Sequence, residues 1–271
     1  MFEQIEEIIK KKNIFSHKNQ GITVAKIEAQ PQGLELAKDI LYKIVDRKTV
    51  LYLSGGSTPK TLYTKLAQEE VLMPGAVGQV DERYGEPMHQ NSNQLMIKGT
   101  GLMRYLEIRD IPFYPILQPV IPAKAGIQGS PIGVGDDNQR KLTAEIYDQK
   151  IRELNTVFPK SVAILGIGAD GHTAGMPALN SKLKDQKSKI YDTFGLITEY
   201  DDKGEVYGER VTMTFLGLEM LDLMILLVFG TDKKEALDQM FEKGREEEIP
   251  ARFYTRPEVA QKTLLITDQN V

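Results

Sequence analysis

The sequence predicts an α/β fold with a mostly parallel, doubly wound (modified Rossmann-like) sheet and helices on both faces. Short apolar runs at residues 49–53, 161–165 and 223–229 each lead into a glycine within two residues. Between these runs lie amphipathic segments in which apolar residues recur at helical spacing. Strands that are apolar throughout are buried on both faces, which is typical of parallel sheets covered by helices on two sides.

The first half of the chain carries clear start signals for its elements. Thr58 and Pro59 predict the start of a helix, with a hydroxyl N-cap followed by proline at the first helical position. Apolar spacing after Pro31 predicts another helix, and β-branched residues before it predict a strand. The elements expected here are strands at 21–27, 49–53 and 77–81, and helices at 31–44, from residue 59 onward, and at 92–104.

The second half begins with a proline- and glycine-rich segment at 112–135, which we expect to be a long surface loop with an insertion at about 118–138. A helix at 139–154 follows, with Leu142, Ile146 and Ile151 forming its apolar pattern. No compositional linker divides the chain, so we expect residues 1–271 to form a single domain. The remaining elements expected are strands at 161–165, 196–199, 211–215, 223–229 and 264–266, and a helix at 233–241 behind a Thr231–Asp232 cap.

Composition narrows the classes of protein to consider. Hydrophobic residues make up 41% of the chain and charged residues 27%, as in ordinary globular proteins. The net charge of −4 argues against a general nucleic-acid binder, and the absence of cysteine excludes thiolate chemistry and disulfides. The first ten residues lack the pattern of a signal peptide, and the longest apolar run is too short to span a bilayer. We therefore expect a cytoplasmic protein.

The loop that follows the strand at 49–53 has the composition of an anion site. Gly55 and Gly56 allow close approach of the backbone, Ser57 and Thr58 add hydroxyl donors, and the helix start adds unpaired N–H groups. An ordinary strand-to-helix turn is the alternative. The spacing of a nucleotide P-loop, with its lysine, is absent.

Asp81, Glu82 and Arg83 form a charge cluster at the end of the next predicted strand. A solvated turn is one interpretation of such a cluster. In the functional interpretation, Arg83 clamps a phosphate with its planar guanidinium, and a carboxylate orients hydroxyls or accepts a proton.

The segment 166–171 matches the dinucleotide fingerprint G-x-G-x-x-G, but we reject that interpretation. The fingerprint requires a full helix directly after the glycines, whereas Pro177 comes six residues after Gly171. A flexible turn that presents Asp170 and His172 side by side explains the sequence better, because a carboxylate can orient an imidazole that titrates near neutrality.

The other two histidines carry weaker signals. His17 lies in a polar N-terminal segment where we expect it to be solvated, and His89 is more typical of a loop residue than of a catalyst. The spacing of histidines and carboxylates suits no closed metal site, so no metal is expected. The three motifs each follow a predicted strand, and ligands in parallel sheets bind at the carboxyl ends of strands. We therefore expect all three to open at one edge of the sheet.

Together these motifs resemble the family that joins 6-phosphogluconolactonases with glucosamine-6-phosphate deaminases. The resemblance extends from about Gly21 to the end of the chain. Its carriers are Leu53-Ser-Gly-Gly-Ser-Thr-Pro59, Asp81-Glu-Arg83 followed by His89 and Ser92-Asn93, Leu165-Gly-Ile-Gly-Ala-Asp-Gly-His-Thr-Ala174, and Arg210-Val-Thr-Met-Thr214.

The wording of these motifs is closer to the lactonase branch. The deaminases carry a glutamate five residues after the histidine, where this chain has Pro177. The resemblance implies a hydrolase that opens 6-phospho-D-glucono-1,5-lactone to 6-phosphogluconate in the oxidative pentose phosphate pathway. The alternatives are a glucosamine-6-phosphate deaminase/isomerase, with Asp81 as the base, and a non-catalytic phosphosugar-binding protein.

The resemblance also implies a division of roles within the site. His172 acts as the base, Asp170 orients it or Asp81 positions the sugar, and no redox cofactor or other cofactor is needed. The expected partner is a phosphosugar lactone, with no nucleic acid and no membrane, and the protein is expected to be a monomer or small homo-oligomer. The residues expected to bind the phosphate are Gly55, Gly56, Ser57, Thr58, Arg83 and Arg210.

Overall fold

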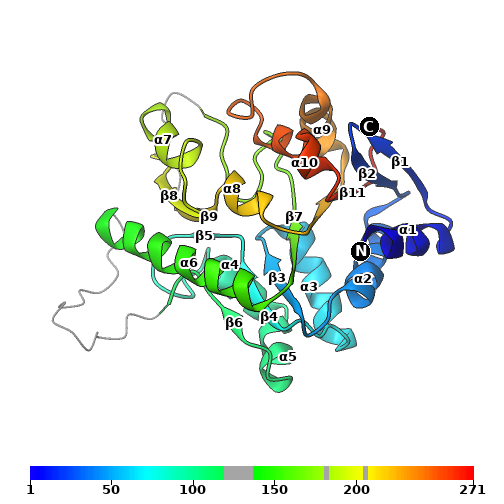
Figure 1. The fold of residues 1–271 in the computed structure, drawn as a ribbon, viewed down its shortest axis with the longest axis horizontal. Helices are drawn as coiled ribbons and strands as arrows, with labels where there is room; N and C mark the ends of the chain where they lie inside the picture. The colour runs from blue at the N-terminus through cyan, green and yellow to red at the C-terminus, as the bar shows by residue number, and fades with distance from the viewer. Residues whose placement is uncertain (119–136, 180–182, 204–206) are drawn as a thin grey trace.

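The predicted parallel sheet forms the centre of a computed structural model that describes residues 1–118, 137–179, 183–203 and 207–271 (Figure 1). Its eight strands have the order β1-β2-β11-β10-β7-β3-β4-β6. Every neighbouring pair is parallel except β1 and β2, which form an antiparallel edge. The strands are β1 Phe15–Asn19, β2 Ile22–Lys26, β3 Thr49–Leu53, β4 Ala76–Gln79, β6 Phe113–Tyr114, β7 Lys160–Leu165, β10 Leu223–Val228 and β11 Thr263–Thr267.

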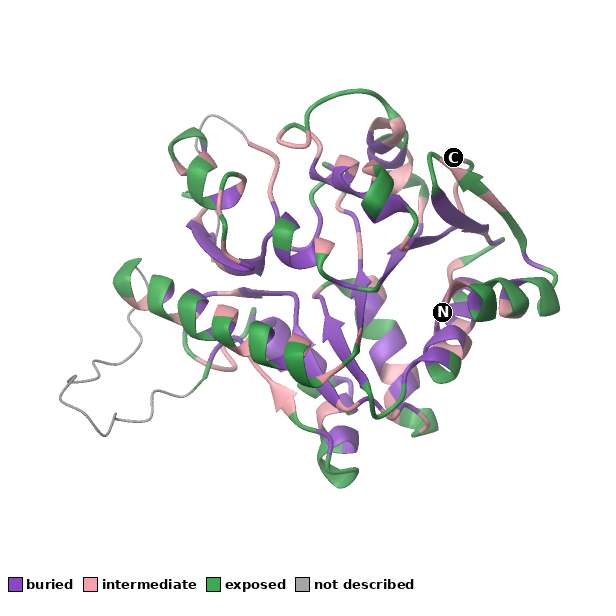
Figure 2. Cartoon of the chain, viewed as in Figure 1, coloured by how far each residue is buried: buried purple, intermediate pink, exposed green. Residues whose placement is uncertain are grey.

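Helices cover both faces of this sheet, as the apolar strands predict, and Figure 2 shows the inner strands buried between them, whereas the edge strands β1 and β6 are partly exposed. Side chains of β3 alternate between two separate cores. Val50 and Tyr52 pack with α6, α9 and the small second sheet, whereas Leu51 and Leu53 pack with α1, α2, α3 and α5. The helices are α1 Phe2–Lys11, α2 Gln30–Ile44, α3 Ser57–Glu69, α4 Asn93–Gly99, α5 Leu102–Ile108, α6 Asp137–Val157, α7 Lys187–Ile190, α8 Phe215–Glu219, α9 Lys234–Phe241 and α10 Pro257–Ala260, and the 3₁₀ segments are η1 Lys184–Gln186, η2 Thr231–Lys233 and η3 Pro250–Thr255.

A second, three-stranded antiparallel sheet has the order β5-β9-β8, with β5 Asp81–Arg83, β9 Glu209–Met213 and β8 Ile197–Asp201. The strand expected at 77–81 was therefore wrong at its end. β4 stops at Gln79, and the charge cluster begins a new strand in the second sheet rather than a loop. Apolar periodicity does not reveal this strand, because its three residues are all charged.

Two helices differ from the sequence prediction, one in its start and one in its continuity. Thr58 is not the N-cap of α3, because Gly56 occupies that position with φ of 107° and the helix begins at Ser57. The helix expected at 92–104 is divided into α4 and α5. Gly101 separates them in a left-handed conformation with φ of 84°, which an uninterrupted helix does not allow.

Helix α6 buries only part of the face expected, because Ile151 is fully buried as predicted but the other two apolar residues are not. Leu142 and Ile146 are about half exposed, whereas Arg140 is 1% exposed and packs beneath the second sheet. A charged residue at this position overrides the apolar pattern because its ion-pair partners come from β8 and β9. The loop expected at 112–135 was also partly wrong, since residues 113–114 form the edge strand β6. Residues 119–136, most of the predicted insertion, lie outside the described residues.

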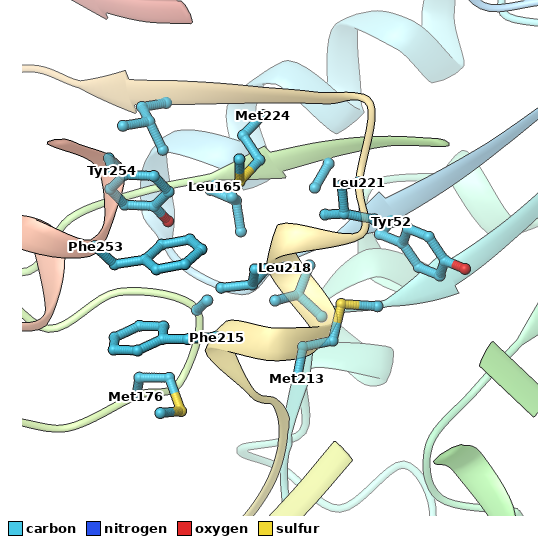
Figure 3. Packing of buried hydrophobic residues seen from close by; sticks show 14 of the residues in the cluster. Tyr52, Leu165, Met176, Met213, Phe215, Leu218, Leu221, Met224, Phe253 and Tyr254 are labelled. Atoms are coloured by element: carbon cyan, nitrogen blue, oxygen red, sulfur yellow. The ribbon is translucent and has the colours of Figure 1, made fainter. Parts of the chain in front are cut away.

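His17 is a structural residue rather than a solvated one. It lies on the antiparallel strand β1, which the sequence analysis did not anticipate, and its Nε2 is 3.1 Å from the carbonyl oxygen of Val271. Figure 3 shows Met176 beside the stacked rings of Phe215 and Phe253, whose centroids are 4.5 Å apart. This packing supports the loop after β7.

Candidate functional site

A pocket of about 610 Å³ opens where the loops after β3, β7 and β10 face the second sheet. The three motifs meet at this one place, as expected, although Asp81–Arg83 reaches it from the second sheet and not from the end of a strand of the central sheet. The side chains or backbone of all nine residues predicted for the site line this pocket. They are Gly55, Gly56, Ser57, Thr58, Asp81, Arg83, Asp170, His172 and Arg210.

The glycine loop after β3 brings backbone amides to the pocket at the start of α3. Gly56 has φ of 107°, a conformation that favours glycine, and Ser57 is the first helical residue. The buried Tyr63 hydroxyl donates to the Ser54 carbonyl at 2.9 Å and so fixes the start of the loop to helix α3. The N–H groups of the first helical turn lack intrahelical partners, so they provide an anion-binding end to the helix.

The charge cluster on β5 is divided between two faces of the strand. Glu82 is fully buried, where its carboxylate accepts hydrogen bonds from the amides of Asn93 at 2.6 Å and Gln94 at 2.8 Å. Burial raises the pKa of Glu82. Asp81 and Arg83 instead line the pocket. The solvated-turn interpretation of this cluster is therefore wrong.

Asn93 connects the first two motifs. Its Nδ2 donates to the Asp81 carboxylate and to the Asp81 carbonyl, both at 3.0 Å. A Cβ on Gly55 would lie 2.1 Å from Asn93 Oδ1, so the loop can approach this side chain only because residue 55 is glycine. Asn93 thus fixes the Asp81 carboxylate and the glycine loop relative to each other.

Two arginines face each other across β5 and β9. Arg83 and Arg210 are directly opposite in register, and both line the pocket. The Arg83 guanidinium donates to the Asn91 carbonyl at 2.9 Å, and the Arg210 guanidinium donates to the Tyr207 carbonyl. Like charges directly opposite on antiparallel strands are destabilising. This arrangement therefore favours an anion that binds both cations.

Asp170 and His172 form a hydrogen-bonded pair at the mouth of the pocket. His172 Nδ1 is 2.5 Å from Asp170 Oδ1, and this contact lowers the pKa of Asp170 to about 2. None of the hydrogen bonds described for this pair uses Nε2, so that nitrogen is the one available to a ligand. A Cβ on Gly168 would lie 2.1 Å from His172 Cε1, which explains the glycine beneath the imidazole.

The loop at 166–179 contains turns and isolated bridges but no helix. Its backbone folds back on itself, with the Gly168 amide donating to the His172 carbonyl at 2.8 Å. The dinucleotide interpretation of these glycines requires a helix at this position. Rejecting that interpretation is therefore confirmed.

Sequence reasoning missed several residues that line the pocket. Lys233 follows β10 in the same way that the predicted motifs follow β3 and β7, so the strand-end rule would have found it. Tyr200 of β8 donates its hydroxyl to the Gly175 carbonyl at 2.7 Å. A strand was expected at 196–199, but the pairing of β8 and β9 with β5, which brings Tyr200 to the pocket, was not.

The described ranges contain no group of three or more His, Cys, Asp or Glu side chains that could hold a metal ion. A search of the same ranges finds no helix with both the length and the apolar character needed to cross a bilayer.

Comparison with known proteins identifies the family of the chain. The sequence profile of the family described as glucosamine-6-phosphate isomerases/6-phosphogluconolactonase matches residues 30–264. The chain belongs to this family.

Individual relatives of this family member are similar over most of their length. A 6-phosphogluconolactonase of Rhizobium meliloti is 28% identical over 76% of this chain and 79% of its own. One from Synechocystis is 31% identical, with coverage of 74% and 75%. The solved 6-phosphogluconolactonase of Plasmodium vivax superposes with a TM-score of 0.69 at 17% identity, covering 99% of this chain and 96% of its own, so it shares the fold.

Proposed function

We propose that this protein hydrolyses 6-phospho-D-glucono-1,5-lactone to 6-phosphogluconate, the second step of the oxidative pentose phosphate pathway. The observation that carries the proposal is that one pocket combines two opposed arginines with an oriented imidazole. The family and the lactonase relatives support the same substrate class.

The substrate phosphate binds between the start of α3 and the arginine pair. Gly55, Gly56, Ser57 and Thr58 supply backbone amides and hydroxyls, while Arg83 and Arg210 neutralise the two negative charges. Lys233 adds a third cation to the pocket wall. The phosphate is remote from the bond that reacts, so these contacts bind substrate and transition state alike.

His172 acts at the lactone carbonyl. Its Nε2 accepts a proton from a water molecule as the water oxygen forms a bond to C1, and the carbonyl becomes a tetrahedral oxyanion. Collapse of that intermediate breaks the bond between C1 and the ring oxygen, which receives the proton back from the imidazolium. Asp170 holds the ring through Nδ1 and stabilises the imidazolium, and Asp81 orients the sugar hydroxyls. No step requires a metal.

A direct assay tests the proposal. Freshly generated 6-phosphogluconolactone is mixed with the protein, and acid release is followed against a blank without enzyme. His172→Ala is expected to lower kcat by about 10²–10⁴-fold, the range typical of general-base catalysis. His17→Ala serves as the matched control, because that histidine lies on the edge strand β1 and should leave the rate unchanged.

The arginine pair makes a separate kinetic prediction. Arg83→Ala should raise KM far more than it lowers kcat, since phosphate binding is uniform through the reaction.

Unchanged turnover in the His172 variant would remove that residue as the base. Release of ammonia from glucosamine 6-phosphate would instead identify a deaminase, although Pro177 occupies the position of the deaminase glutamate and none of the described residues that line the pocket is a glutamate.

A further inference from the structure

His89 lies on the loop between β5 and α4 and has no role in the reaction described above. Its Nε2 is 2.9 Å from the Arg83 carbonyl oxygen, and its Nδ1 is 3.3 Å from the Asn91 amide nitrogen. A carbonyl can only accept a hydrogen bond, and an amide N–H can only donate one. Both contacts are satisfied together only by a neutral imidazole that carries its hydrogen on Nε2.

These contacts lead directly to the first arginine. The Asn91 amide donates to His89, and the Asn91 carbonyl accepts from the Arg83 guanidinium at 2.9 Å. His89 also contacts the Arg83 carbonyl. The imidazole therefore holds both the backbone of Arg83 and the acceptor that orients its side chain.

The imidazole is also connected to the second arginine, Arg210, through Tyr207. The imidazole stacks on Tyr207, with ring centroids 5.1 Å apart and planes inclined by 10°. The carbonyl of Tyr207 accepts from the Arg210 guanidinium. Gln90, the next residue in the chain, donates to the Tyr207 hydroxyl at 2.9 Å, so the loop contacts Tyr207 at a second point.

We propose that His89 is a positioning residue that holds the Arg83–Arg210 pair in the orientation that receives the substrate phosphate. This inference rests on the proposed function of the pocket. Two guanidinium groups that face each other repel and tend to separate, and each donates to a backbone carbonyl that restrains it. The neutral imidazole holds the two residues that supply these carbonyls: it accepts a hydrogen bond from the Asn91 amide and stacks on the Tyr207 ring. It adds no further positive charge.

The surroundings fit a ring of this size. A Cβ on Gly85 would lie 3.1 Å from His89 Cδ2, so the backbone at Gly85 packs against the edge of the imidazole. His89 is half-buried, and it does not line the pocket. It therefore acts through the arginines and not on the substrate.

The test compares His89→Phe with wild type. Phenylalanine retains a ring for the Tyr207 stack but lacks both nitrogen contacts. Loss of the two neutral hydrogen bonds is expected to raise KM for the phosphorylated lactone by about three- to tenfold, equivalent to about 0.7–1.4 kcal/mol in total. The kcat should stay within about twofold of wild type, because the contacts act on uniform binding. Gln90→Ala is the matched control, since it removes the hydrogen bond to the Tyr207 hydroxyl but leaves both nitrogen contacts of His89 in place. It should change KM less than His89→Phe does.

A double-mutant cycle with Arg83→Ala shows whether His89 acts through that arginine. The effect of His89→Phe on KM should largely disappear in the Arg83→Ala background. Imidazole ¹⁵N shifts of the wild-type protein near neutral pH should show hydrogen on Nε2 and a bare Nδ1. His89→Gln, which keeps a donor and an acceptor, should recover part of the lost affinity.

Several outcomes would overturn the inference: an unchanged KM in His89→Phe, a full effect retained in the Arg83→Ala background, or a fall in kcat at constant KM. Binding of inorganic phosphate, measured by calorimetry, separates this inference from the proposed function. If the wild-type protein does not hydrolyse the lactone, the proposed function fails. A weaker phosphate affinity in His89→Phe than in wild type would still support the positioning role, and equal affinities would refute it.

Discussion

The buried guanidinium of Arg140 makes the most quantitative prediction for stability. Its side chain is 2% exposed and contacts three carboxylates: Glu199 and Asp137, each at 2.6 Å, and Glu209. Glu199 and Glu209 come from β8 and β9, so this one residue attaches helix α6 to the second sheet. The same strands present Tyr200 and Arg210 to the pocket.

Arg140→Met keeps the aliphatic volume and removes the charge. The two buried glutamates then lose their guanidinium partner, although Lys189 still contacts Glu199 at 2.7 Å. Removing one member of a buried ion pair typically costs about 3–5 kcal/mol. For a chain of this size each kcal/mol corresponds to roughly 2–4 °C, so the expected loss in Tm is about 6–20 °C.

Thermal unfolding by circular dichroism and urea titration measure this loss. Arg152→Met on the same helix is the matched control, because Arg152 is about half exposed and contacts Asp148 as a surface pair. Such pairs contribute about 0–1 kcal/mol. If the two variants lose similar stability, or if Arg140→Met loses less than about 1 kcal/mol, the argument from burial is wrong. Combining Arg140→Met with Glu199→Gln and Glu209→Gln should recover part of the loss.

Two further predictions concern the pocket. Gly55→Ala places a Cβ 2.1 Å from Asn93 Oδ1 and should break the contacts of Asn93 with Asp81. The expected loss in the free energy of unfolding is about 1–3 kcal/mol. Gly166→Ala is the control, because its Cβ would meet its nearest atom at 3.8 Å, and an equal loss in both variants would contradict the prediction. The pKa of Asp170 is lowered to about 2 by His172, so the stability from this pair is present above pH 3.8 and lost as pH falls toward 2. Asp170→Asn should therefore unfold at higher pH than wild type in acid titrations, with the difference vanishing near pH 2.

Apolar and β-branched runs were sufficient to find the inner strands of the central sheet. The strand at 49–53 matches β3 at both ends, because a central parallel strand must be apolar on both faces and is bounded by glycine. Loop position followed from the same rule, which is why the residues expected at the strand ends line one pocket. Edge strands such as β1 and β6 carry polar or short sequences, so periodicity does not identify them.

The strands expected at 196–199 and 211–215 correspond to β8 and β9, but their place in a separate sheet with β5 was not predictable, and Arg140 shows the physical reason. Its partners Glu199 and Glu209 lie 59 and 69 residues along the chain, so no local window associates the three charges. Without them, the helix appears to bury Leu142 and Ile146, which are in fact about half exposed. Contacts between distant polar residues decide which face is buried, and they also place Arg210 opposite Arg83.

The structure also changes which residues carry the argument for an anion site. Gly55 has a sufficient structural reason to be glycine, because Asn93 occupies the space of a side chain there. The glycine pair alone therefore does not demonstrate a phosphate. The described residues offer no such packing reason for the opposed Arg83 and Arg210, since their register brings like charges together and costs stability in the absence of a ligand. A fold retains such a cost where an anion reverses it. The case for a phosphorylated substrate thus depends on the arginine pair more than on the loop that first suggested it.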